Sequence, residues 1–208
     1  MNRLIKTRKD DTFIKHVHCE FINCFVEGKQ QAIPSTITKT YVFEDNPNDL
    51  GSRFHIESLL NSLQIFKKYY PLKYKYEFDI TKKTFNISMQ PVVGEHFTFE
   101  YEKFFELYKE FLLKLHDSRI LDNGFVSCVD FTTDKNFKYG NIQYYKNQLI
   151  CVDESKLVSH KSKTRAKTVA FLNPLRYFGS GPMADTLNNL DLNKITKDLL
   201  ELVNEIYD

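Results

Sequence analysis

The sequence predicts an α+β fold in which short strands and one helix come first and longer helices follow. β-prone residues alternate with polar ones over residues 36–43. Apolar residues recur with a helical period over residues 52–70 and again over 98–115. A chain of 208 residues is long enough for one domain with its own core, or for two small lobes.

The N-terminal region is expected to be mostly strand. Residues 1–11 are charged and are expected to be frayed, whereas residues 12–26 are β-prone, with a break near Glu20 or Asn23. A turn signal at residues 27–29 precedes the alternating strand, which is expected to begin after Pro34. A polar loop then leads to the first helix.

The first helix is predicted for residues 52–70, because its apolar residues share one face and Pro71 ends it. The face consists of six residues, Ile56, Leu59, Leu60, Leu63, Phe66 and Tyr70. Two strands at residues 73–80 and 84–89 are expected to form a hairpin. Residues 90–95 then leave the second strand as an extended linker.

The C-terminal half is expected to be largely helical. Thr98 is predicted to cap a helix that ends near residue 115 and carries the clearest amphipathic pattern of the chain. The basic, polar segment 156–167 is expected to be a solvated loop, and the apolar run that follows is expected to kink at Pro174. Asp191 is predicted to cap a final amphipathic helix.

The candidate chemistry lies in residues 125–155, where polar side chains follow predicted strands. An apolar run ends at Asp130, polar residues continue to Asn136, and a short β-hairpin ends at Asp153. Because each of these groups sits where a strand stops, we expect one cleft to gather all three. Phosphoryl transfer uses such a set: a carboxylate orients the attacking hydroxyl, and an amide oxygen and a second carboxylate hold Mg²⁺ on the phosphates.

These residues resemble a known motif. The run Val129-Asp130-Phe131-Thr132, then Asn136, then a hairpin ending in Cys151-Val152-Asp153, resembles the HGDFTPxN motif, hairpin and acid of aminoglycoside and choline kinases. The order of predicted elements over residues 36–155 is likewise similar to that of the protein-kinase-like fold. Cys128 stands where the family has His, and the spacing from Asp130 to Asn136 is longer than the family's.

The resemblance implies a two-lobed α+β fold. Residues 1–90 would form an N-terminal lobe, a small antiparallel sheet plus the helix at 52–70. Residues 91–96 would be the hinge, and residues 97–208 a reduced helical C-terminal lobe that carries the catalytic hairpin 125–155.

The resemblance also implies ATP and Mg²⁺ as cofactors and gives roles to the polar residues. Asp130 would be the catalytic base, and Asn136 and Asp153 would bind the metal. A second alignment matches residues 134–141 to the same motif. It makes Asn141 the metal-binding amide and puts Asn136 in place of the catalytic Asp, so that the chain would be a pseudokinase.

In the N-terminal half the resemblance assigns cofactor binding to four residues. Lys39 would contact the ATP phosphates, and Glu57 would be its ion-pair partner; Lys29 is the alternative lysine. Gln90 and Val92 lie in the segment that resembles the hinge. The glycine-rich loop with which kinases cover the phosphates is missing, so other backbone groups or basic side chains would have to take its place.

Three functions follow from this sequence. The first is an ATP- and Mg²⁺-dependent phosphotransferase, a minimal Ser/Thr-type kinase acting on a protein. The second is a pseudokinase that regulates a partner protein. The third is a nucleic-acid- or partner-binding protein that uses the basic segment 156–167, although interleaved aromatic residues are absent there and nucleic acid is not the expected partner.

Composition adds weaker expectations. The net charge of +2 argues neither for nor against nucleic acid. The four cysteines form no CxxC pair and are expected to be free, mostly buried thiols. No apolar run is long enough for a membrane span, so a soluble protein of the cytoplasm, a reducing compartment, is expected.

Overall fold

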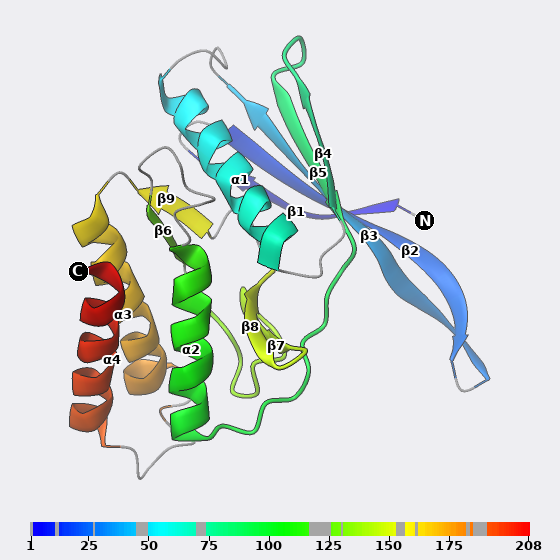
Figure 1. Cartoon of the computed structure of the whole chain (residues 1–208). Helices are drawn as coiled ribbons and strands as arrows, with labels where there is room; N and C mark the ends of the chain where they lie inside the picture. Colours follow the sequence, from blue (N-terminus) through cyan, green and yellow to red (C-terminus); the bar gives the residue numbers. More distant parts are fainter. Residues whose placement is uncertain are drawn as a thin grey trace. The chain divides into compact units, whose positions relative to one another are not determined.

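The computed structural model describes residues 2–10, 13–26, 28–44, 50–69, 74–116, 126–129, 131–152, 157–160, 162–181, 184 and 191–208. The chain forms two compact units (Figure 1). Unit 1 comprises residues 1–57 and 71–92, and unit 2 comprises residues 58–70 and 93–208. Helices and an antiparallel sheet occur in one chain, which confirms the predicted α+β class.

Unit 1 is built on a five-stranded antiparallel sheet with the strand order β1-β2-β3-β5-β4. The strands are β1 (Asn2–Lys9), β2 (Phe13–Val26), β3 (Lys29–Phe43), β4 (Tyr74–Asp79) and β5 (Thr84–Met89). Helix α1 (Leu50–Tyr69) follows β3, and its part up to Glu57 belongs to unit 1. The hairpin β4–β5 and the helix agree with the sequence prediction to within a few residues.

One face of this sheet is the core of unit 1, and we call it the inner face. Its buried apolar residues are Phe13, Cys19, Tyr41, Phe43, Phe85, Ile87 and Met89. The ring of His55 in α1 packs edge-on against that of Phe13, with the centroids 5.2 Å apart, so α1 lies on this face. The opposite, outer face is polar, and Thr38 and Thr40 bond across it to Ser88 and Asn86 at 3.0 and 2.8 Å.

The prediction of a frayed N-terminus is wrong, because residues 2–9 form the edge strand β1. All of its side chains are exposed, which explains why its charged sequence gave no strand signal. A strand at the edge of a sheet pairs through its backbone and can carry charged side chains.

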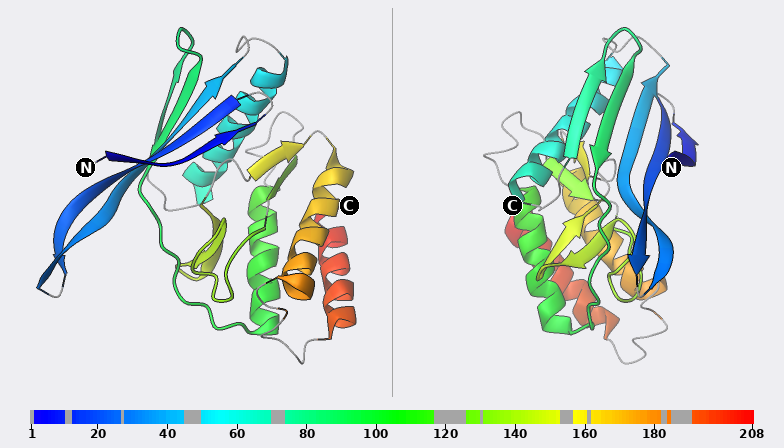
Figure 2. Two further views of the ribbon diagram at one scale, coloured as in Figure 1. Left: turned by 180° about the vertical axis from the view of Figure 1, so that it is seen from behind. Right: turned by 90° about the vertical axis from the view of Figure 1, so that its right-hand side faces the viewer.

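Strands β2 and β3 run on beyond their neighbours as a two-stranded ribbon (Figure 2). Pairing with β1 stops at Glu20, and pairing with β5 stops at Ile37, so the ribbon has two open edges. The register shifts after Glu20, where the sequence suggested a break. Strand β3 begins before Pro34 rather than after it, since a proline is tolerated where a strand has a partner on one side only.

Among its described residues, unit 2 contains the end of α1 from Ser58 onward, three further helices and two short antiparallel strand pairs. The elements are α2 (Tyr101–Leu115), β6 (Val126–Val129) paired with β9 (Leu157–His160), β7 (Ile142–Tyr145) paired with β8 (Gln148–Cys151), α3 (Lys163–Ser180) and α4 (Leu192–Tyr207). Helix α3 packs against α4 and against the pair β6–β9, and α2 contacts β8 and α4 (Figure 1).

The helices of unit 2 test three predictions from the sequence. The Asp191 carboxylate accepts from the backbone of Asn193 and Lys194 and caps α4, as predicted. The Thr98 cap is wrong, because α2 begins after Glu100, which makes no side-chain cap. The expected basic loop 156–167 is also wrong, since β9 and the first turn of α3 occupy part of it. Pro174 lies inside α3, and the kink expected there stays a prediction.

Aromatic side chains form the core of unit 2 between α2, α3 and the loop after β6. Ring contacts connect Phe97, Phe104, Tyr108, Phe131, Phe137, Tyr144, Tyr177 and Phe178. All are buried, and the Tyr108 hydroxyl donates to the Ala170 carbonyl at 2.7 Å. Edge-on and offset ring pairs add to the burial of apolar area, so this cluster is a rigid base for the loop above it.

Candidate functional site

The candidate site is the loop 131–141 between β6 and β7, which the sequence assigned to catalysis. Asp134 organises it: one carboxylate oxygen accepts from the backbone N–H of Lys138 at 2.7 Å and of Tyr139 at 2.8 Å. Its backbone N–H donates to the Tyr139 carbonyl at 3.0 Å. Asp134 therefore closes the turn, and the sequence gave it no such role.

Phe137 anchors the loop to the aromatic core of unit 2, and its side chain is 0% exposed. The residue has a left-handed φ of 54°, which turns its ring into the aromatic core against Phe97 and Tyr177. The Tyr177 hydroxyl donates to the Asp134 carbonyl at 3.1 Å. Burial, and then the nearby Asp134 carboxylate, raise the pKa of Tyr177, so this donor stays protonated.

Two glycines let other backbone segments approach the loop. Gly140 has a φ of 110°, and a Cβ there would lie 2.6 Å from the Thr132 carbonyl oxygen. A Cβ on Gly94, in the linker before α2, would lie 2.8 Å from the Phe137 oxygen. A larger residue at either position would open the loop, because the backbone atoms that its Cβ meets cannot easily shift. At Gly140, L side chains also rarely adopt the observed φ.

Asn141 lies where the loop enters β7. Its N–H donates to the Thr132 carbonyl at 2.8 Å, and its carbonyl accepts from the Val152 N–H at 2.9 Å. Val152 directly precedes Asp153, so the structure brings Asn141 to the chain segment that carries the predicted metal carboxylate. Asp153 itself, like Asp130, lies outside the described residues.

Asn136 is at a different point of the loop. It is half-buried, and its carbonyl accepts from the Phe97 N–H at 2.9 Å, beside the linker that precedes α2. Backbone bonds therefore connect Asn136 to the linker and Asn141 to Val152. Of the two metal-binding amides considered from the sequence, Asn141 is the one whose backbone is bonded to Val152, the residue that precedes Asp153 in the sequence.

The four residues assigned to cofactor binding all belong to unit 1. Lys39 is buried in β3, paired with Val17 on one side and Ile87 on the other. Glu57 is exposed on α1; Gln90 is exposed just after β5, and Val92 is half-buried. Their roles remain predictions.

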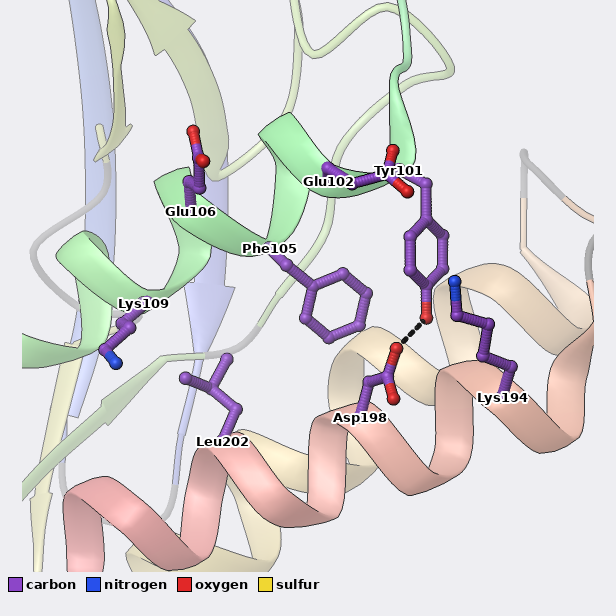
Figure 3. Close-up of a pocket in the computed structure, with 8 residues that line it drawn as sticks. All are labelled: Tyr101, Glu102, Phe105, Glu106, Lys109, Lys194, Asp198 and Leu202. Carbon is purple, nitrogen blue, oxygen red and sulfur yellow. Dashed lines mark hydrogen bonds between the residues drawn. The ribbon is translucent and has the colours of Figure 1, made fainter.

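A surface groove of about 410 Å³ lies elsewhere in unit 2, between α2 and α4 (Figure 3). The Tyr101 hydroxyl donates to Asp198 at 2.6 Å, and the Lys194 ammonium lies 4.4 Å from the centre of the Tyr101 ring. Burial, and then the bond to Asp198, raise the pKa of Tyr101, so it does not supply a base. These contacts join two helices, and none of the residues predicted for catalysis lines the groove.

Within the described residues, no three His, Cys, Asp or Glu side chains form a group that could hold a metal ion. His16 and His18, two residues apart on β2, have no such third member among the described residues, and His16 bonds to Thr7 at 3.1 Å. Cys19, Cys24 and Cys151 are free thiols, as predicted, while the side chain of Cys128 is not described. No described helix is both long and apolar enough to cross a membrane.

No known family model matches the chain, and no curated protein has a matching sequence.

Proposed function

We propose that this protein is a pseudokinase: a module with protein-kinase-like organisation that binds a Mg²⁺-nucleotide and regulates a partner protein without transferring phosphate. The observation that carries the proposal is the Val152-to-Asn141 backbone bond. It favours the alignment in which Asn141 and Asp153 are the metal-binding pair. In that alignment the catalytic aspartate is replaced by Asn136.

The donor chemistry suits the metal. Mg²⁺ prefers oxygen ligands and is commonly bound by one or two protein groups together with phosphate oxygens. An amide oxygen from Asn141 and a carboxylate from Asp153 are donors of that kind. When bound, the metal would neutralise charge on the nucleotide phosphates. The bonds around Asp134 and Phe137 support the proposal because they hold the loop before any ligand binds.

In the proposed alignment, Asn136 would leave the protein without a catalytic base. A carboxylate accepts the proton of an attacking hydroxyl, whereas a neutral amide has no comparable basicity. The chain also lacks a glycine-rich loop. A protein built in this way would use the nucleotide to order its own structure and present a surface to a partner.

The third function considered from the sequence, binding through residues 156–167, has less support. The Lys167 ammonium lies 2.6 Å from the Asp208 carboxylate, and the Lys163 ammonium lies 3.4 Å from the Asp208 carbonyl. Two cations of the basic segment thus contact Asp208 at the C-terminal end of α4 and hold α3 to α4, so they are less available to a partner.

Thermal unfolding with ATP and Mg²⁺ tests the binding. At a ligand concentration of about 100 Kd we expect about 2.7 kcal/mol of stabilisation, or roughly 5–10 °C in Tm. The Mg²⁺-dependent part should disappear in Asn141→Ala and in Asp153→Ala. Asn193→Ala, on the exposed side of α4, is the matched control and should keep the full shift.

Phosphate transfer from radiolabelled ATP separates the pseudokinase from the kinase. We expect no transfer by the native chain to itself or to a generic protein acceptor, and a gain of transfer in Asn136→Asp. Transfer by the native chain that is lost in Asp130→Asn would instead support the first alignment, with Asp130 as the base.

A further inference from the structure

The far end of β2 has an edge along which no described residue of the chain pairs (Figure 2). Pairing with β1 stops at Glu20, and a further strand also needs clearance from β1, which leaves Ile22–Val26 free along this edge. Backbone N–H and C=O groups at the edge of a sheet are ready to bond to another extended chain. On the other side of the ribbon, the edge of β3 is open beyond Ile37.

The turn between β2 and β3 decides which backbone groups face the open edge. Val26 pairs with Lys29 across a turn of two residues. A turn of that length closes with a backbone hydrogen bond, and from there hydrogen-bonded and non-hydrogen-bonded pairs alternate along an antiparallel ladder. Cys24 therefore directs its backbone groups toward β3, whereas Asn23 and Phe25 direct theirs toward the open edge.

Pro34 agrees with this assignment and distinguishes the two edges. It is opposite Phe21, a non-hydrogen-bonded pair like that of Asn23 with Ala32, so its missing N–H removes no bond to β2. The missing donor falls on the open edge of β3, where Lys29 is also exposed. Proline and lysine are residues with which proteins block an edge strand, so the edge of β3 is protected.

The edge of β2 has no such protection. Residues 21–26 read Phe-Ile-Asn-Cys-Phe-Val, without a charge, a proline or a glycine. Ile22 is 52% exposed and Phe25 is 79% exposed, and the two point to opposite faces of the ribbon. An uncharged, β-prone edge pairs readily with another strand, and a two-stranded ribbon is stabilised when further strands join it.

We propose that Ile22–Val26 pairs with the same stretch of a second copy of this chain, antiparallel about a two-fold axis at Cys24. Residues bond across an edge only where both direct their backbone groups toward it. Asn23 of each copy therefore pairs with Phe25 of the other. The two pairs exchange about four backbone hydrogen bonds and join the ribbons into one sheet with the strand order β3-β2-β2-β3. The dimer does not depend on nucleotide binding.

A second copy suits this edge because the free stretch matches itself. Cys24 is the middle residue of Ile22–Val26, so the whole stretch is used in both copies. Since the stretch is uncharged, self-pairing places no like charges opposite each other. A two-fold axis at Asn23 would bring Val26 to Glu20, where Asn2 of β1 already pairs. An axis at Phe25 would place Asn23 opposite the turn.

Both faces of the joined ribbons gain contacts in this register. The two Phe25 residues are diagonal neighbours, with backbone positions about 7–8 Å apart, which is within reach of aromatic side chains. On the other face the two Cys24 residues are directly opposite each other as a non-hydrogen-bonded pair, with Cα atoms about 4.5 Å apart. The contact is smaller than a standard interface, so we expect a dissociation constant of about 10–100 µM.

Sedimentation velocity of the full chain under reducing conditions, up to about 500 µM, tests the dimer. We expect a monomer–dimer equilibrium without larger species, because a two-fold contact is closed. Asn23→Pro removes an N–H that faces the second copy and none that faces β3, so the affinity should fall at least tenfold. The matched control is Ala32→Pro, because Ala32 pairs with Asn23 and its N–H faces the opposite edge. It should change the affinity less than twofold.

Oxidation tests the register. Diamide takes up the two thiol hydrogens as a disulfide forms, and a Cα separation of about 4.5 Å is within the range of disulfides. We expect a covalent dimer of the native chain on a non-reducing gel. It should be absent in Cys24→Ser and retained in Cys19→Ser, which removes a buried thiol of the same strand.

A chain that stays monomeric at every concentration would overturn the proposal, and so would a dimer whose affinity is unchanged in Asn23→Pro. If both proline variants lose the dimer, the cross-link decides: a Cys24 disulfide in the native chain supports the two-fold register, and its absence overturns it. Circular dichroism checks that the variants are folded. Nucleotide binding is measured separately, so either proposal can fail while the other stands.

Discussion

Unit 1 and unit 2 position their polar side chains by different physical means. On the edge of unit 1, the pairing of β1 with β2 decides which face Lys6 takes, and that side chain is exposed. In unit 2, Asp134 and Asn141 belong to a loop fixed by backbone bonds and by the buried ring of Phe137. The loop of unit 2 should therefore lose its conformation when the aromatic core is disturbed. The positions of the side chains of β1 in unit 1 should depend only on the register of the strand.

The largest effect should come from removing the ring beneath the loop. Phe137→Ala leaves a cavity in the aromatic core and should lower the free energy of unfolding by about 3–5 kcal/mol. Urea denaturation measures it. Tyr139→Ala, two residues on but 57% exposed, should change stability by less than about 0.5 kcal/mol. Equal losses in the two variants would mean that the loop does not depend on its buried ring.

A smaller loss is expected at the turn before Asn141. Gly140→Ala forces a Cβ against the Thr132 carbonyl at a φ of 110° and should destabilise by about 2–3 kcal/mol. Gly179→Ala in α3 is the control, because nothing lies within 4 Å of its Cβ; it should stabilise by about 0.5–1 kcal/mol. Thermal melts should show a lower Tm for Gly140→Ala and a higher Tm for Gly179→Ala than for the native chain. A lower Tm in both variants would contradict the described loop conformation.

Acidification should weaken unit 2 through His116, at the end of α2. Burial, and then the nearby Lys163 cation, lower the pKa of His116 to about 4, and its ring packs against Tyr207. The unfolded chain takes up this proton near pH 6.5 and the folded chain only near pH 4, so stability falls as the pH drops through that window.

The expected loss is about 1–2 kcal/mol, reduced from the full shift because solvent screens a ring that is not fully buried. Urea titrations at pH 7 and pH 4.5 measure it. His116→Phe should lose this part of the pH dependence, whatever its own stability. An unchanged dependence in that variant would assign it to other groups.

The smallest effect should come from deleting Ile5. Because this residue has no partner on β2, its removal keeps every pair of the β1–β2 ladder and leaves Arg3 and Lys6 on the inner face. The free energy of unfolding should change by about 1 kcal/mol or less, as urea denaturation measures. A loss of several kcal/mol would show that the extra residue is needed for the pairing of β1 with β2.

Sequence periodicity predicted the elements whose side chains are sorted between core and solvent. Helices α1, α2 and α4, the hairpin β4–β5 and the Asp191 cap all follow from residue patterns. Strand β1 does not, because it pairs through its backbone and its side chains are charged. Strand β9 lies in a basic stretch with no alternation, and Thr98 resembled a cap although α2 begins three residues later.

For the candidate site, the sequence identified the right stretch but left two alignments open. Loop length alone does not tell which amide, Asn136 or Asn141, lies near the end of β8. The backbone bond from Val152 to Asn141 supplies that information. The contribution of Tyr177 was not predictable, since it reaches Asp134 from a helix more than forty residues away along the chain.

The open ribbon of β2 and β3 has a practical consequence. Its turn contains Gly28 at a φ of 75°, the exposed Lys29 begins β3 directly after it, and Phe25 nearby is 79% exposed. Trypsin should therefore cut first after Lys29, while the strand pairs from Phe13 to Glu20 keep both fragments in one sheet. Such a nicked protein would run as two bands on a denaturing gel and as a single peak on a sizing column.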